Sequence, residues 1–244
     1  MKVRARFAKR GKVRFTSHRD LARMWERALR RAELPVAYTQ GFSPRPKLHF
    51  GLALPTGAES EAEYLDIDLA EPADGGPASL DVATLPARLT PCLPAGITVT
   101  AAAIVDTGVM SLQQAVTSCT WRLGVSGTTA QEAAVAVERA LAADHIVITR
   151  ERKGKQVTDD LRPTISALAV LGETPDGVEL EAELATQPRS VRPSELLSAL
   201  DPPLAERRVC RIHQWVTLDG VRAEPLSLGP AVAPPTAHAE VRAS

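Results

Sequence analysis

Hydrophobic and polar residues alternate strictly at the start of the chain. Residues 2–7 place apolar side chains on one face and basic side chains on the other, and residues 12–15 repeat this pattern. The connection Lys9-Arg10-Gly11 has the composition of a turn. The pattern predicts a β-hairpin whose exposed face is a row of cations. The alternative is that these cations only keep the edge of a sheet solvated.

A helical period replaces the alternation after Ser17. Residues 18–32 carry apolar side chains at spacings of three and four, which predicts a helix with one buried stripe. Ser17 is a natural N-cap, and Asp20 three residues later gives an Asp-containing version of the capping box. The opposite face carries Arg19, Arg23, Arg27 and Arg30. Only Glu26 offsets these arginines, whereas a merely solvated helix face tends to mix charges of both signs.

The next segment, LPVAYTQGFSPRPKLHFGLALPTG, combines cations with aromatic residues and prolines. Pro44 and Pro46 favour extended backbone before them, and Gly41 permits a sharp turn. We interpret residues 38–47 as a stiffened loop that holds phosphate while an aromatic ring stacks on a base. The alternative is an ordinary Pro-rich connection with packed aromatic residues. A strand is predicted for residues 47–54.

An acidic strand follows, within GAESEAEYLDIDL. Its alternation predicts Leu65, Ile67 and Leu69 facing inward, with Tyr64 and two aspartates on the other side. Asp66 and Asp68 could bind a divalent cation through their carboxylate oxygens. We favour the alternative that they form a solvated face of the sheet.

The predicted order of elements from the hairpin onward is β-α-β-β-α-β, which is the ferredoxin-like arrangement. It includes a helix at residues 78–89 and a strand at 96–105. The second half is predicted as strands at residues 117–126, 145–150, 178–185 and 208–218, and helices at 130–143, 159–170 and 193–200. The fold class is therefore α+β, with two tandem ferredoxin-like halves that have antiparallel sheets. We place these halves at residues 1–108 and 115–219, followed by a disordered, Ala/Pro-rich tail at residues 220–244.

The charge distribution is strongly asymmetric along the chain. The first fifty residues carry 14 Lys and Arg against 3 Asp and Glu, a net charge of +11, and the remainder carries 15 against 26, or −11. Seven of the nine aromatic residues also precede residue 65. Clustered cations and aromatic side chains are typical of a polyanion-binding surface. We therefore expect function to reside in the N-terminal half.

Other features of the composition point to a cytoplasmic protein. No stretch approaches twenty apolar residues, and the N-terminus has no apolar segment typical of a secretion signal. Cys92, Cys119 and Cys210 are far apart, which favours reduced structural thiols over a disulfide framework or a metal site. We expect no cofactor and no metal.

No nucleophile elbow, Walker loop, dinucleotide fingerprint or zinc-type cluster is present in the sequence. His18 and Asp20 could act as an acid–base pair, but residues two apart on a helix do not face each other. His49 could transfer a proton or contact phosphate. The catalytic candidates are therefore His18, Asp20 and His49.

The run from Phe15 to Leu69, FTSHRDLARMWERALRRAELPVAYTQGFSPRPKLHFGLALPTGAESEAEYLDIDL, resembles the signature of a bacterial family of unknown function, the radical-SAM-linked (radical-SAM-associated) conserved hypothetical proteins. The resemblance is specific over about residues 3–69 and is weaker at DDLRPTI, SVRPSELL and RRVCRIHQW. Members occur as free proteins or fused behind a radical SAM domain. The family usually shows His-Pro-Lys where this chain has Arg45-Pro46-Lys47, so a histidine at that position is not essential chemistry here.

The resemblance implies a cytosolic location and a functional link to a radical SAM enzyme, with RNA as a plausible substrate. This chain lacks the Cys-x3-Cys-x2-Cys cluster of such enzymes, so it is not the radical enzyme by itself. Our leading interpretation is an accessory RNA-binding or substrate-presenting protein that works with a separate radical SAM enzyme in RNA modification. The alternatives are an RNA-processing or RNA-modifying enzyme that uses His18 or His49, and a protein–protein adaptor.

The expected nucleic-acid contacts combine the hairpin, the helix and the loop, although the sequence does not show that they share one surface. They are Arg4, Arg6, Arg14, Arg19, Arg23, Arg27, Arg30, Tyr38, Phe42, Ser43, Arg45 and Lys47.

Overall fold

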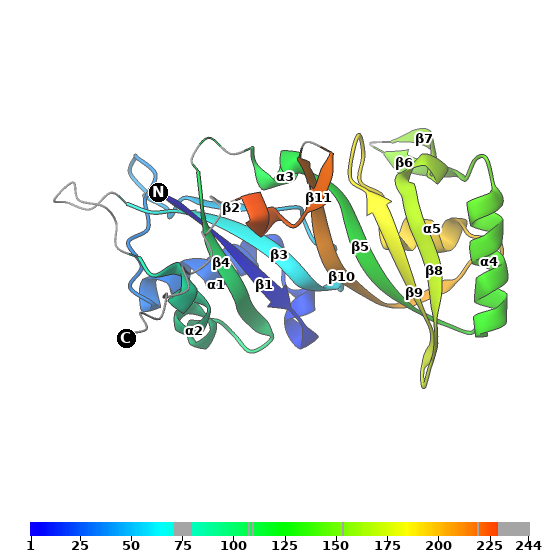
Figure 1. Cartoon of the computed structure of the whole chain (residues 1–244), viewed down its shortest axis with the longest axis horizontal. Helices are drawn as coiled ribbons and strands as arrows, with labels where there is room; N and C mark the ends of the chain where they lie inside the picture. The colour runs from blue at the N-terminus through cyan, green and yellow to red at the C-terminus, as the bar shows by residue number, and fades with distance from the viewer. Residues whose placement is uncertain (71–79, 107, 109, 153, 219, 229–244) are drawn as a thin grey trace, which may run out of the picture.

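Short helices alternate with long strands in the computed structural model, which describes residues 1–70, 80–106, 108, 110–152, 154–218 and 220–228 (Figure 1). The strands are β1 (Lys2–Lys9), β2 (Leu48–Phe50), β3 (Glu59–Asp68), β4 (Ile97–Val105), β5 (Val116–Ser126), β6 (Val147–Arg152), β7 (Lys155–Asp160), β8 (Ile165–Thr174), β9 (Gly177–Ala185), β10 (Ala205–Leu218) and β11 (Val221–Ala223). The α-helices are α1 (His18–Arg31), α2 (Leu85–Leu89), α3 (Leu112–Ala115), α4 (Ala130–Ala142) and α5 (Pro193–Ala199). The 3-10 helices are η1 (Gly11–Phe15), η2 (Val82–Thr84), η3 (Thr90–Cys92), η4 (Arg162–Thr164) and η5 (Pro225–Leu228). Within these residues, no helix is long and apolar enough to cross a membrane.

One sheet connects the two halves of the chain. Seven strands lie in the order β4-β1-β3-β10-β5-β9-β8, while β2 pairs with β3 and β11 pairs with β10 (Figure 1). All these pairs are antiparallel except β3–β10, which is parallel and joins Glu59 to Cys210 and Ser60 to Arg211. The strands β6 and β7 form a separate hairpin.

The two halves repeat one arrangement of strands. The first half runs β1-α1-β2-β3-α2-β4 along the chain and is ordered β4-β1-β3-β2 in space. With the β6–β7 hairpin set aside, the second half runs β5-α4-β8-β9-α5-β10 and is ordered β10-β5-β9-β8. The predicted α+β class with mostly antiparallel strands is confirmed. The sequence analysis does not predict the parallel β3–β10 pair, which makes the sheet continuous across both halves.

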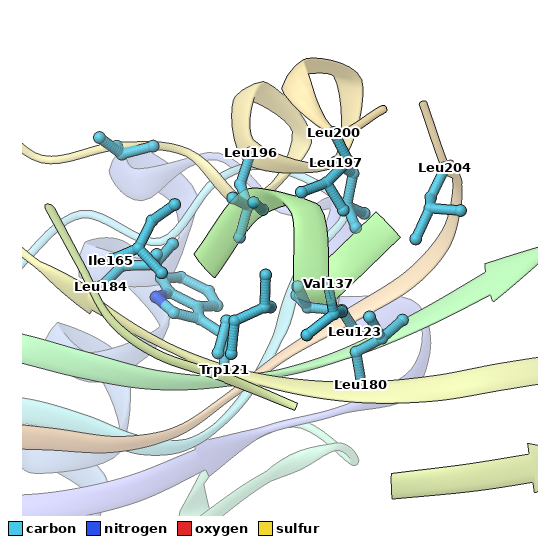
Figure 2. Close-up of a cluster of buried hydrophobic side chains, with 14 of the residues drawn as sticks. Trp121, Leu123, Val137, Ile165, Leu180, Leu184, Leu196, Leu197, Leu200 and Leu204 are labelled. Atoms are coloured by element: carbon cyan, nitrogen blue, oxygen red, sulfur yellow. The ribbon is translucent and has the colours of Figure 1, made fainter. Parts of the chain in front are cut away.

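Each half has its own hydrophobic core. In the first half, the buried stripe of α1 packs on β1, where the rings of Phe7 and Trp25 meet edge to face with centroids 5.0 Å apart. In the second half, leucines of α5 approach Trp121 and Leu123 of the sheet, with Val137 of α4 between them (Figure 2). Removing one of these buried leucines would cost about 2–5 kcal/mol of stability.

The opposite face of the sheet is covered in the first half by the C-terminal part of the described chain. Ala62 and Tyr64 of β3 are buried there against Leu112 of α3, with Leu226 of η5 packed against them. Residues 221–228 therefore form β11 and η5, whereas the sequence analysis includes them in a disordered tail. The rest of that tail, residues 229–244, lies outside the described residues.

The predicted N-terminal hairpin is wrong in its second strand. Residues 11–15 form the 3-10 helix η1, and β1 pairs with β3 and β4 instead. Gly11 enters η1 at a φ of 68°, and its backbone N–H donates to Glu59 Oε1 at 2.8 Å. The alternation of Val13 and Phe15 therefore reflects a short turn on the surface, not a strand.

The helix predicted at residues 159–170 is also wrong, because the chain there completes β7, forms η4 and enters β8. Its buried residues Leu161, Ile165 and Leu168 recur at spacings of four and three, as in a helix. The second spacing comes from an irregularity in the pairing of β8 with β9 between Ile165 and Ala167. A bulge of this kind lets a strand imitate a helical period. The helix predicted at residues 78–89 is shorter than expected, with α2 at Leu85–Leu89, and residues 78 and 79 lie outside the described residues.

The basic face of β1 is neutralised by the acidic strand β3. Arg4 is fully buried and donates to Asp66 through Nε at 2.7 Å and Nη2 at 2.9 Å, while Nη1 donates to the carbonyl oxygen of Pro225 at 2.9 Å. Lys2 lies 3.8 Å from Asp68. Asp66 is therefore buried, and the sequence interpretation of this strand as a solvated acidic face is wrong at that position.

We expect Arg4→Met to lower the free energy of unfolding by about 3–5 kcal/mol, because Asp66 would be left as an unpaired buried charge. The double variant Arg4→Met/Asp66→Leu should recover most of this loss, since both charges are then absent. Urea unfolding of the three proteins measures the effect. Equal stability of the single and double variants would contradict the assigned role of the ion pair.

Glu59 connects η1 with the second half of the sheet. Its side chain accepts hydrogen bonds from Gly11, from Arg14 Nη1 at 3.2 Å and from Arg208 Nε at 2.9 Å. Burial opposes ionisation of this carboxyl, but the hydrogen bonds from Arg208, Gly11 and Arg14 outweigh burial and hold its pKa below the usual value. The ionised form is therefore favoured by folding.

A lowered folded-state pKa means that the stabilisation by Glu59 is present above the unfolded pKa, about 4.5, and is lost as the pH falls through the folded value. We expect Glu59→Gln to destabilise the protein at pH 7 and to flatten the decline in stability below about pH 4.5. Urea unfolding between pH 7 and pH 3 measures this. Glu138→Gln, at an exposed position on α4, is the matched control and should retain the decline. If the stability of Glu59→Gln declines below about pH 4.5 as steeply as that of the unmodified protein, the prediction is wrong.

Candidate nucleic-acid interface

The outer face of α1 presents a row of arginines to solvent. Ser17 caps the helix as predicted, because its Oγ accepts from the Asp20 N–H at 3.1 Å and donates to Asp20 Oδ2 at 2.7 Å. The opposite stripe of the helix is buried, so the exposed residues of the row are Arg19, Arg23, Arg27 and Arg30. Among the described residues, only Arg23 has a carboxylate nearby, Asp20 Oδ1 at 3.6 Å. Three of the four guanidinium groups are thus without an ion pair in the described chain.

The loop after α1 is closed at its base and open at its tip. Tyr38 pairs with Pro46, and Thr39 and Arg45 exchange two hydrogen bonds of 2.9 and 3.1 Å. Gly41 has a φ of 128°, which supports the sharp turn expected there. The tip places Phe42 fully in solvent, and Tyr38 is 45% exposed.

The polar members of the predicted loop site are exposed as well: Ser43, Arg45 and Lys47. In the described chain, neither cation has a carboxylate within 4.0 Å. Phe42, which precedes both cations, is fully exposed and has no packing role in the described structure. The loop therefore offers one aromatic face and two charges to a ligand.

The arginine row and the loop are adjacent along the helix. The chain returns from Arg31 at the end of α1 to Val36, which pairs with Leu69, in only a few residues. The Lys47 N–H donates to the Ala37 carbonyl at 2.8 Å, which fixes the loop base beside the end of β3. The row on α1 therefore begins near β2, where His18 meets Phe50, and ends at the base of the loop.

The predicted contacts from β1 and η1 do not belong to this surface. Arg4 is buried against Asp66, and Arg6 lies 3.5 Å from Glu224. Arg14 donates to Glu59 and lies over the Phe15 ring at 4.7 Å. The hairpin prediction placed these side chains on a free face, whereas β3, η5 and the end of β11 supply their partners.

Both histidine candidates line one cavity of about 420 Å³, together with Lys2 and Phe50. The His18 ring meets the Phe50 ring edge to face, with centroids 5.0 Å apart. The His49 Nε2 atom lies 3.4 Å from Asp68 Oδ2. Asp20 pairs with the N-cap Ser17, and no hydrogen bond joins it to His18 in the described structure. The structure thus brings the two histidines together but does not pair His18 with Asp20.

A second cavity, of about 110 Å³, shares His18 and Phe50 with the first and is lined by Lys9 and Glu63. Both charged residues are buried. Burial lowers the pKa of Lys9, and the nearby charge of Glu63 acts in the opposite direction. The sequence analysis missed this pair, although the signal was present. Lys9 follows Val3, Ala5 and Phe7 at every second position, so it belongs to the inward face of its strand. Glu63 lies two positions before Leu65 and therefore on the same face of its strand.

The three thiols are unpaired in the structure. Burial raises the pKa of Cys119 and of Cys210 to about 11, so both are protonated thiols at neutral pH. In the described part of the chain, no group of three or more His, Cys, Asp or Glu side chains is placed to hold a metal ion. The charged and titratable groups that line these cavities include Lys2 and Asp66 in the larger one and Lys9 and Glu63 in the smaller one, with His18 in both.

The chain matches the model of a bacterial family over residues 2–193, from β1 to the first residue of α5. It belongs to this family, the uncharacterized proteins conserved in bacteria (DUF2344). No curated protein matches the chain. The matched region contains the arginine row, the loop and both cavities.

Proposed function

We propose that this protein binds single-stranded RNA on α1 and the following loop and presents it to a separate enzyme. The observation that carries the proposal is the uneven pairing of N-terminal cations. Four cations of β1 and η1 have acidic partners, three of them on β3: Lys2, Arg4, Arg6 and Arg14. In contrast, Arg19, Arg27 and Arg30 of α1 have none in the described chain. Folding thus neutralises one part of the +11 segment and leaves the other part exposed.

The exposed groups suit the two components of an RNA strand. Arginines three and four residues apart on one helix face can follow successive phosphates, and their guanidinium groups match phosphate geometry. Tyr38 and Phe42 offer rings on which unstacked bases can stack. The stiff loop places those rings at the end of the arginine row. This combination favours a single strand over a duplex, whose bases are not accessible to stacking.

We infer that the two halves are tandem ferredoxin-like units. Their shared strand order supports this, with the last strand at one edge, the first and third in the middle and the second at the other side. The β6–β7 hairpin is then an insertion between the first helix and the second strand of the second unit.

The enzyme that receives the RNA is proposed to be a radical SAM enzyme in the cytoplasm. The resemblance of residues 15–69 to radical-SAM-linked proteins supports this partner. The three cysteines are separated by at least 27 positions, so the chain supplies no cluster ligands in the spacing that such an enzyme needs. The three cysteines are free, which agrees with a reducing compartment.

A second function is favoured by the cavity that holds both histidines. His18 and His49 with Lys2 could move a proton and stabilise negative charge during RNA cleavage or modification. Incubation of the isolated protein with RNA, followed by analysis of the products, separates the two functions. Product formation that is lost in His18→Ala would favour the enzyme, and intact RNA would favour presentation.

We expect the double variant Arg23→Glu/Arg27→Glu to weaken binding of a labelled single-stranded RNA at least tenfold. Removing two phosphate contacts should also lower the slope of log affinity against log salt by about 1.4, at roughly 0.7 per contact. Fluorescence anisotropy across a salt series measures both quantities.

The matched control is Arg139→Glu/Arg207→Glu, which reverses two exposed arginines of the second half. The control should bind RNA as the unmodified protein does. Unchanged affinity of a folded Arg23→Glu/Arg27→Glu protein would remove α1 from the interface. A complex with a protein partner that survives nuclease treatment would instead favour an adaptor.

We expect Phe42→Ala to weaken binding of the same RNA by roughly 5- to 100-fold, because stacking of a base on an aromatic side chain contributes about 1–3 kcal/mol. The melting temperature should not change, since the ring is fully exposed. Phe42→Trp should retain the affinity. A loss of stability together with binding would show that the ring packs within the protein.

A further inference from the structure

Two neighbouring cavities beside the N-terminus of α1 share an aromatic wall, and we call them together the recess. The larger cavity has the size range of small-molecule sites, and His18 and Phe50 line both cavities. We call the smaller one, which is lined by the buried Lys9 and Glu63, the inner cavity. The rings of His18 and Phe50 form the shared wall. Each cavity therefore offers an aromatic wall against which a flat group can pack.

The inner cavity carries one cation and one carboxylate whose hydrogen-bonding capacity is unused. The Lys9 Nζ atom makes a single hydrogen bond, of 3.3 Å, to the Thr16 carbonyl, although an ammonium group has three donors. The Glu63 side chain is 91% buried, its Oε1 has no hydrogen bond, and its nearest charge is Arg211 Nε at 3.3 Å. Buried polar groups are normally satisfied, so this pair suggests a ligand that completes it.

The charges of this recess restrict the class of ligand. An anionic group deep in the inner cavity would meet Glu63, and a cationic group would meet Lys9 and Arg211. A neutral group with a hydrogen-bond acceptor next to N–H donors satisfies Lys9 and Glu63 together. A carboxylate accepts best from two adjacent N–H groups.

We propose that the recess binds one unstacked guanine base, with its O6 accepting from Lys9 and its N1–H and N2–H donating to Glu63. Among the four RNA bases, only guanine carries an acceptor followed by two donors on one edge. Uracil would place a second carbonyl oxygen against the carboxylate. Adenine and cytosine lack the N–H donor at the ring nitrogen of this edge.

The recess lies where the arginine row begins. His18 lines both cavities and is the first residue of α1, and Arg19 follows it on the exposed face. A strand whose phosphates follow the row could therefore place one base in the recess. This assignment rests on the proposed function, because it takes the RNA strand from it and adds which base is selected.

The test compares labelled octaribonucleotides, one made only of uridine and others with a single central guanosine, adenosine, cytidine or inosine. We expect the guanosine strand to bind about tenfold more tightly than the uridine strand, as for a bidentate contact to a base edge. Inosine lacks the 2-amino group and should lose part of this preference. Because the inosine comparison uses the unmodified protein, it does not depend on the folding of a variant.

Glu63→Gln should reduce the guanosine preference to less than about twofold. The glutamine side chain has only one acceptor oxygen, so its NH₂ group would face either N1–H or N2–H of the base, and two donors would then meet. Glu61→Gln is the control, since Glu61 is the preceding acidic residue of β3 and pairs with Arg10. The Glu61→Gln protein should prefer guanosine to the same extent as the unmodified protein. Melting temperatures show whether both variants are folded.

Titration with free guanosine separates failure of this inference from failure of the proposed function. Equal binding of all the octamers by the unmodified protein would overturn the guanine site and leave RNA binding intact. If no octamer binds but guanosine binds and Glu63→Gln abolishes it, the recess is confirmed and the RNA-presenting function is wrong. A guanosine preference that persists in a folded Glu63→Gln protein would overturn the contact with Glu63.

Discussion

The buried ion pair between Arg4 and Asp66 constrains the N-terminal half more than any single apolar contact. A guanidinium group without solvent needs a partner, and Asp66 lies directly opposite Arg4 in the pairing of β1 with β3. A shift of one residue would place Arg4 opposite a buried Leu65 or Ile67 and turn every side chain of the strand to the other face. The ion pair therefore selects one register. The same pairing neutralises Lys2 and Arg4 of β1, whereas α1 and the loop keep exposed cations that have no acidic partner in the described chain.

A second constraint acts where the halves meet. Arg211 of β10 donates to the carbonyl oxygens of Leu52 and Ala53 at 3.1–3.3 Å, and its guanidinium carbon lies 5.1 Å from the centre of the Trp121 ring. One buried side chain of the second half thus holds residues 51–56 of the first half in place. These residues separate the inner cavity beside His18 from another cavity, of about 360 Å³, beside Trp121. The shape of the recess consequently depends on both halves.

Elements in which hydrophobic residues recur at regular spacing could be predicted from the sequence. Elements that depend on partners far away in the sequence could not. The stripe of α1, its Ser17 cap and its arginine face follow from local spacing, and all three agree with the structure. The burial of Arg4 and Asp66 depends on their pairing, and the two residues are 62 positions apart in the sequence. The irregularity after Ile165 gives the buried residues of a strand the spacing of a helix. The pairing of β3 with β10 joins Glu59 to Cys210, about 150 residues apart in the sequence. Neither strand has a sequence pattern that indicates this pairing. The alternation places Lys9 and Glu63 at inward positions of their strands. Only the register of the strands shows that the two residues lie near each other.

The hydrogen bond from Arg4 to Pro225 also has a consequence for synthesis on the ribosome. The acceptor is synthesised 221 positions after the donor. Until then, the nascent first half holds a cation that is only partly satisfied, and the edge of β3 lacks β10. The first half therefore keeps an unpaired strand edge until β10 has been made, and Arg4 gains its last hydrogen bond only when the last described segment closes over β1.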